Sequence, residues 1–204
     1  MQVIPKSEQK MLTRQFRRSH HAEGYAYLLG FALCVPLANW LIQNVGTVCV
    51  PHGPCLVPVA PGVMAPSGVL AIGLALVLRD LVQRRLGLGW AFGAIVTGAI
   101  LSATFAPPAL VIASTAAFLL SELADLAVFT PLQRRGLVRA VALSSFVGLF
   151  VDSIVFLWLA FGSLAYLPGQ VIGKAWMVVL ALPLVWLLRQ RDAARAVENG
   201  RTAR

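Results

Sequence analysis

Residues 138–161 read VRAVALSSFVGLFVDSIVFLWLAF, a run long enough to cross a lipid bilayer as one helix. About 20 consecutive apolar residues span the hydrocarbon core. Asp152 stands near the middle of this run. A charge at that depth costs about 2.5–3.5 kcal/mol even on insertion scales, so it persists only where it faces water or a protein interior. The stretch therefore predicts a transmembrane helix whose carboxylate points into a helical bundle.

The rest of the chain has the same apolar character. Its 204 residues are 58% hydrophobic and 12% charged, with a mean hydropathy of +0.78. Soluble domains carry about 25% charged residues, so a soluble globular fold is excluded. We expect an all-α polytopic membrane protein with six transmembrane helices in one bundle, at residues 24–45, 66–82, 89–105, 109–130, 138–161 and 167–188. Residues 1–23 and 190–204 are expected to be basic segments that flank a membrane domain of residues 24–189.

The basic residues lie on one side of this predicted bundle. Sixteen of the 17 Lys and Arg residues precede the first segment, follow the last, or fall in the connections after the second and fourth. We assign Arg79, Arg84 and Arg85 to the first of these connections. The loops on the other side contain no Lys or Arg, so the positive-inside rule places both termini in the cytoplasm. A multi-pass protein of the cell inner membrane is expected, with its first helix retained.

The net charge of +9 does not indicate a nucleic-acid partner. Nucleic-acid-binding proteins gather Lys and Arg on one face or stripe of a domain, often with aromatic residues. Here the basic residues form clusters beside apolar runs, where they act as orientation signals. No nucleic acid is therefore expected as a partner.

Three more ionisable residues lie inside predicted helices. Glu122 and Asp125 are spaced i, i+3 and share a face of the fourth helix. They suit a cationic or N–H-rich ligand or a proton relay, although Asp125 also suits snorkelling to the interface. Lys174 falls at nearly the same depth as Asp152, counting 1.5 Å per residue from opposite ends. A structural ion pair, a ligand site, or both are compatible with that depth.

Weaker signals accompany these charges. Asn39 in the first helix and Gln170 in the sixth add hydrogen-bonding groups. Trp40, Trp158 and Trp176 are either interfacial anchors or surfaces on which a flat ligand stacks.

The connection at residues 46–65 carries a Cys-x5-Cys pair. Outside the cytoplasm Cys49 and Cys55 can form a disulfide, with reduced thiols or a metal site that includes His52 as alternatives. Three ligands do not close a structural metal site, so no metal is expected. Residues 169–174 lack the spacing of a phosphate-binding loop, and no cofactor is expected. Cys34 is expected to be an apolar filler.

Four stretches together resemble the queuosine precursor transporters, within the vitamin-uptake transporter group. They read APSG (65–68) leading into LRDLVQRRLG (78–87), ASTAAFLLSELADLAVFTPL (113–132), SSFVGLFVDSIVF (144–156) and GQVIGK (169–174). The resemblance implies a six-helix importer of 7-deazaguanine bases such as preQ0, preQ1 or queuine. It also implies that the family's polar positions are Asp80, Glu122, Asp125, Asp152, Gln170 and Lys174. Arg84 departs from this pattern, since members often carry an acid there.

The chemistry of a deazaguanine suits these residues. One carboxylate, from Glu122 or Asp152, can accept the ring N–H and the exocyclic amine together. Lys174 or Gln170 can donate to the ring carbonyl, and an aromatic side chain can stack on the plane. The expected partners are thus a small planar heterocycle and the lipid bilayer, with a homodimer or a coupling partner left open. One alternative is a substrate-binding membrane subunit of a multi-component vitamin importer. A second is an intramembrane enzyme, which is less favoured because the sequence shows no convincing Ser–Lys or Ser–His pair. We expect no enzymatic activity.

Overall fold

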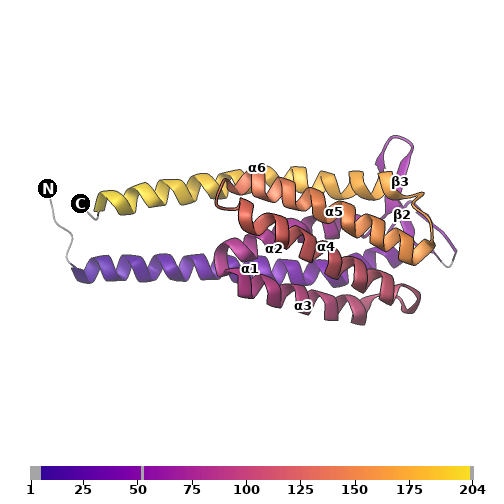
Figure 1. Cartoon of the computed structure of the whole chain (residues 1–204), viewed down its shortest axis with the longest axis horizontal. Helices are drawn as coiled ribbons and strands as arrows, with labels where there is room; N and C mark the ends of the chain where they lie inside the picture. The colour runs from indigo at the N-terminus through magenta and orange to yellow at the C-terminus, as the bar shows by residue number, and fades with distance from the viewer. Residues whose placement is uncertain (1–5, 52, 203–204) are drawn as a thin grey trace.

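The computed structural model describes residues 6–51 and 53–202, and within them the chain forms a long helical bundle. The helices are α1 (Lys6–Asn44), α2 (Val69–Leu86), α3 (Leu88–Phe105), α4 (Val111–Leu132), α5 (Leu137–Phe161) and α6 (Leu167–Thr202). A 3-10 turn, Pro108–Leu110, precedes α4, and the strands are β1 (Val48–Cys49), β2 (Cys55–Ala60) and β3 (Val63–Pro66). The strands lie at one end of the bundle and the two chain termini at the other (Figure 1). We call these the sheet end and the terminal end.

Five of the described helices are long and apolar enough to cross a membrane. The candidate spans are His20–Asn44, Leu88–Phe105, Pro108–Leu132, Leu137–Phe161 and Leu167–Arg195. The all-α polytopic class is therefore confirmed. The remaining predicted span, the second one at residues 66–82, corresponds to α2, which holds Arg79, Asp80, Arg84 and Arg85 within 18 residues. Because of these charges α2 is not among the candidate spans, and six crossings remain a prediction.

The connection at residues 46–65, expected to be a loop, instead forms a small sheet at the end of the all-α bundle. β1, β2 and β3 form a three-stranded antiparallel sheet in that order, and Gly62 turns the β2–β3 hairpin at a φ of 72°. The Nε1 atom of Trp176 donates to the carbonyl of Val59 at 3.0 Å, and the Ser67 hydroxyl donates to the carbonyl of Leu41 at 2.7 Å. These bonds fasten the sheet to α6 and α1.

The two terminal helices run well past the predicted membrane boundaries. Most of the flanking segments at residues 1–23 and 190–204 continue α1 and α6 as helix. At the terminal end Arg85, whose side chain is 3% exposed, contacts Glu23 at 3.0 Å and Asp192 at 2.9 Å. The two acids belong to α1 and α6, so one arginine of α2 links three helices. Such pairs stabilise helical turns that lie beyond the apolar core.

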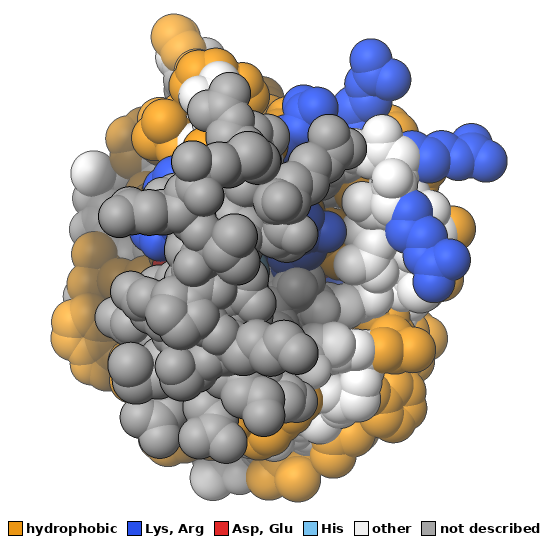
Figure 2. Space-filling model, turned by 90° about the vertical axis from the view of Figure 1, so that its left-hand side faces the viewer, with side chains coloured by type: hydrophobic (Ala, Val, Ile, Leu, Met, Phe, Trp, Pro, Cys, Tyr) orange, Lys and Arg blue, Asp and Glu red, His pale blue; other side chains and the backbone are white. Residues whose placement is uncertain are grey.

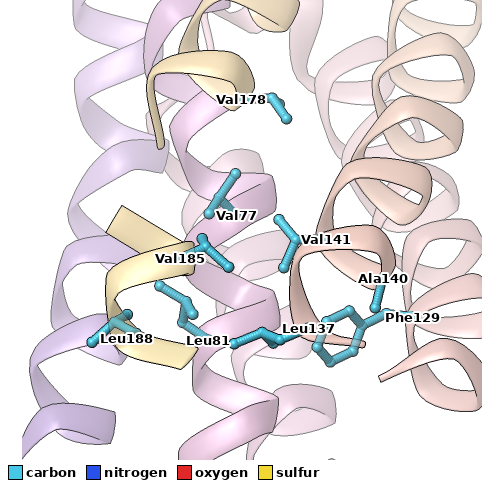
Figure 3. Close-up of a cluster of buried hydrophobic side chains, with 9 residues drawn as sticks. All are labelled: Val77, Leu81, Phe129, Leu137, Ala140, Val141, Val178, Val185 and Leu188. Atoms are coloured by element: carbon cyan, nitrogen blue, oxygen red, sulfur yellow. The ribbon is translucent and has the colours of Figure 1, made fainter. Parts of the chain in front are cut away.

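Apolar packing fills the bundle in two clusters. The larger one joins α2, α4, α5 and α6 and consists of Val77, Leu81, Phe129, Leu137, Ala140, Val141, Val178, Val185 and Leu188 (Figure 3). The second joins α1, α2, α3 and α4 around Phe31 and Phe118, whose ring centroids are 5.9 Å apart. Seen from the terminal end, hydrophobic side chains are visible around much of the rim, and Lys and Arg side chains project from one part of it (Figure 2). Many large hydrophobic side chains along the helices are exposed, among them Leu29, Ile112 and Leu180. An apolar exterior of this kind suits a lipid environment.

The membrane orientation can be tested by labelling single cysteines. Pro61 lies exposed in the β2–β3 turn and Arg135 lies exposed in the α4–α5 connection. We expect Pro61→Cys to react with an impermeant maleimide in intact cells, and Arg135→Cys to react only after permeabilisation. The unaltered chain is the control, because its free Cys34 is buried. The reverse labelling pattern would overturn the positive-inside assignment.

The cysteine pair gives a second test. Cys49 and Cys55 face each other across β1 and β2, and their Sγ atoms are bonded in the structure; His52 lies outside the described residues. We predict that non-reducing peptide mapping of protein purified from membranes finds Cys49 linked to Cys55 and Cys34 as a free thiol. Recovery of two alkylated thiols at these positions would contradict the disulfide.

Candidate functional site

A cavity opens among the helices in the half of the bundle nearer the sheet end. Its empty volume is about 530 Å³, including the part that opens to solvent. Its polar lining consists of Asn39, Ser102, Ser114, Asp152, Gln170 and Lys174, and its aromatic lining of Phe118 and Phe156. Aliphatic side chains of α1 and α2 complete the wall. We call this cavity the pocket.

Lys174 organises the polar wall of the pocket. Its Nζ atom donates to Asp152 Oδ2 at 2.5 Å, to Ser153 Oγ at 2.8 Å and to Gln170 Oε1 at 2.5 Å. An ammonium group has three protons, so every donor of Lys174 has an acceptor. The ion pair weighed from the sequence is therefore present, and it lies on the surface of the pocket where a ligand can reach it.

Two glycines allow α6 to lie close enough for this arrangement. A Cβ atom on Gly73 of α2 would lie 2.7 Å from the carbonyl oxygen of Lys174, and one on Gly169 would lie 2.1 Å from the carbonyl oxygen of Met64. Backbone therefore packs directly on backbone at both positions. The glycines have a packing role, and they set the depth at which Gln170 and Lys174 enter the pocket.

A second group of charges surrounds Arg79 and is separate from the pocket lining. Arg79 contacts Asp80 through Nη1 at 3.0 Å, Glu122 through Nε at 2.9 Å, and Asp125 through Nη2. The four side chains are at most 2% exposed. We call these four residues the Arg79 cluster. The assignment of Arg79 to a helix connection was wrong, because its guanidinium is wholly buried among acids.

Neighbouring polar groups extend the Arg79 cluster. The Ser144 hydroxyl of α5 donates to Asp80 Oδ2 at 2.8 Å. Arg79 Nη1 also donates to Gln83 Oε1 at 3.3 Å, and Gln83 Nε2 donates to Thr130 Oγ1 at 3.0 Å. Phe118 lines the pocket and Glu122 follows one helical turn later on α4. The Arg79 cluster thus lies next to the pocket, on its terminal-end side.

The predicted site residues therefore divide into two sets. Asn39, Asp152, Gln170 and Lys174 line the pocket. Asp80, Glu122 and Asp125 are predicted ligand contacts that lie instead in the Arg79 cluster and are not among the lining residues. The structure thus has two polar centres where one was expected. The clue in the sequence was Arg79–Asp80 itself, a charged pair inside the segment predicted to span at residues 66–82.

The aromatic residues of the pocket also differ from those expected. Trp40, Trp158 and Trp176 are 54%, 62% and 52% exposed and do not line the pocket. Phe118 and Phe156 do. No sequence pattern distinguished these two phenylalanines from lipid-facing ones, because both stand in apolar helical runs.

The Asp152–Lys174 pair can be tested by single and double replacement. Lys174→Met should lower stability by about 3–5 kcal/mol, because it leaves the carboxylate of Asp152 buried without a cation. Adding Asp152→Asn should recover most of that loss. Thermal unfolding of the purified protein in detergent measures both effects. Arg189→Met, at an exposed position of α6, is the control and should unfold at the same temperature as the unaltered protein. If Lys174→Met also unfolds at that temperature, the pair is not needed for stability.

Comparison with known protein families finds a match to part of the chain. Residues 100–188 match the model of a family described as "Putative vitamin uptake transporter". The matched stretch contains Glu122, Asp125, Asp152, Gln170 and Lys174. No curated protein and no solved structure matches the chain. The match supports the vitamin-uptake transporter group, and with the apolar helices it indicates a multi-pass membrane protein of transporter type.

Proposed function

We propose that this chain imports a queuosine precursor, a 7-deazaguanine base such as preQ0, preQ1 or queuine, across the cell inner membrane. The observation that carries the proposal is the pocket, where an acid, a base and an amide adjoin two aromatic rings. Pockets that bind flat heterocycles combine apolar walls with a few fixed polar groups. The family match supports transport of a small nutrient, and the resemblance of four sequence stretches supports the deazaguanine class.

Asp152 is the best candidate for the amine edge of the base. It is 8% exposed and lines the pocket, whereas Glu122 lies in the Arg79 cluster. Lys174 occupies only one lone pair of Oδ2, and a carboxylate offers about four acceptor sites. Asp152 can therefore accept a ring N–H and an exocyclic amine while it keeps its contact with Lys174. The three protons of Lys174 are already used within the protein, whereas the Gln170 side chain accepts from Lys174 through Oε1 and can donate to the ring carbonyl through its NH₂ group.

The position of the pocket supports uptake from outside. The pocket lies in the sheet-end half of the bundle, which the positive-inside rule places away from the cytoplasm. Toward the terminal end the path is filled by the cluster of Val77, Leu81, Phe129 and their neighbours, and then by the Arg85 ion pairs. This arrangement fits a state that takes up its ligand at the sheet end.

Ligand binding by purified protein tests the proposal. A ligand at 100 times its Kd stabilises a protein by about 2.7 kcal/mol, so preQ0 should raise the unfolding temperature. Asp152→Asn should weaken preQ0 binding at least tenfold, about 1.4 kcal/mol, because the amide replaces one acceptor oxygen with a donor. Asp192→Asn, at the terminal end, is the matched control and should bind as the unaltered protein does.

Two outcomes would contradict the proposal. Stabilisation by a water-soluble vitamin and not by preQ0, preQ1 or queuine would exclude the deazaguanine class. Chemical conversion of the bound base would favour an intramembrane enzyme over a transporter.

A further inference from the structure

We propose that the Arg79 cluster binds the proton whose movement drives uptake. This inference rests on the proposed function as an importer. The proton site is then distinct from the pocket. The evidence for it is the excess of acids over cations among the four residues and the hydrogen bonds that those residues make.

The cluster holds more acid than its arginine can balance. Each of Nη1, Nε and Nη2 of the guanidinium faces one carboxylate, from Asp80, Glu122 and Asp125 in turn. One positive charge thus meets three groups that are negative when ionised. At 2% exposure or less, water cannot screen the excess. Buried carboxyl groups without a compensating cation take up protons instead of remaining charged.

A second observation indicates where a proton binds. Asp80 uses both oxygens, one toward Arg79 and the other for the Ser144 hydroxyl. Asp125 directs Oδ1 toward Arg79, whereas no cation among the described residues contacts its wholly buried Oδ2 atom. The carboxyl group of Asp80 and the hydroxyl group of Ser144 lie within hydrogen-bond reach of Asp125. Two carboxyl groups can share a hydrogen bond only when one of them carries a proton, so a proton on Oδ2 allows Asp125 to donate to Asp80.

Few other charges act on this site. On α5 the nearest polar group is Ser144, and Asp152 is already paired with Lys174 of α6. Gln83 of α2 and Thr130 of α4 are neutral. α3 has no ionisable residue, and Glu23 of α1 is paired at the terminal end. Asp152 still acts on Glu122 through space, so the protonation of the cluster is governed by its own acids, by Arg79 and, from outside the cluster, by Asp152.

The location of the cluster couples the proton to the ligand. Phe118 in the pocket wall and Glu122 in the cluster lie one turn apart on α4. On the other side, Gln83 and Thr130 continue the polar contacts toward the terminal end. Asp125 takes up a proton when the base binds. The base and then the proton are released on the terminal-end side, so one proton moves with each base. No other chemical change is required.

Reconstituted protein provides the test. The full chain in liposomes, with the membrane potential clamped at zero, is given radiolabelled preQ0. Exchange of labelled for unlabelled preQ0 without any gradient reports the proposed function alone. A pH gradient of about one unit, acidic on the side of the sheet end, should then concentrate preQ0 about tenfold. Exchange without pH-driven accumulation, or accumulation driven by sodium instead, would overturn the proton assignment while leaving the importer in place.

A variant locates the proton. Asp125→Asn should keep exchange and lose pH-driven accumulation, because the amide cannot take up or release the proton. Ser145→Ala, a buried change on α5 outside the cluster, is the control and should keep both. Accumulation by Asp125→Asn equal to that of the unaltered protein would overturn the site.

Infrared spectroscopy of the unaltered protein gives a readout that needs no variant to fold. At pH 7 a protonated carboxyl band that changes on addition of preQ0 would support the site. A spectrum with only ionised carboxylates would overturn it.

Discussion

The buried guanidinium of Arg79 is the constraint on which the interior of this bundle depends. It contacts Asp80 on its own helix and Glu122 and Asp125 on α4, while Ser144 of α5 binds Asp80. Three helices therefore meet around one cation that has no access to water. Taking such charges out of water is costly, and the cost is recovered only when each finds a partner with good geometry. Arginine suits this position because its planar fork offers several donors in fixed directions.

The two polar centres differ in charge balance, and that difference separates their roles. In the pocket, Lys174 and Asp152 form a one-to-one pair whose remaining acceptor capacity faces the cavity. In the Arg79 cluster, one cation faces three buried acids that are not among the residues lining the pocket. A balanced pair beside empty space suits recognition of a neutral, hydrogen-bonding ligand. An unbalanced and closed cluster suits the binding of a small cation.

Apolar runs of about 20 residues predicted the helices, and charges at membrane depth, which are rare, indicated an Asp152–Lys174 pair. Counting residues from opposite helix ends predicted that Asp152 and Lys174 lie at the same depth, and Lys174 Nζ lies 2.5 Å from Asp152 Oδ2. The same reasoning failed for Arg79, because an arginine near a predicted helix end has the appearance of an orientation signal. The strands were missed because β1 and β3 have only two and four residues. Phe118 and Phe156 could not be selected, since an inward-facing and a lipid-facing phenylalanine look alike in an apolar run.

Both centres are completed by residues outside the stretch that matches the transporter family. Residues 100–188 supply Glu122, Asp125, Asp152 and Lys174. Arg79 and Asp80 come from α2, and Asn39 in the pocket comes from α1. The matched stretch by itself would leave Glu122 and Asp125 without their cation and the pocket without one wall. The first part of the chain is thus held to the matched stretch by the ion pairs that Arg79 of α2 makes with the two acids of α4.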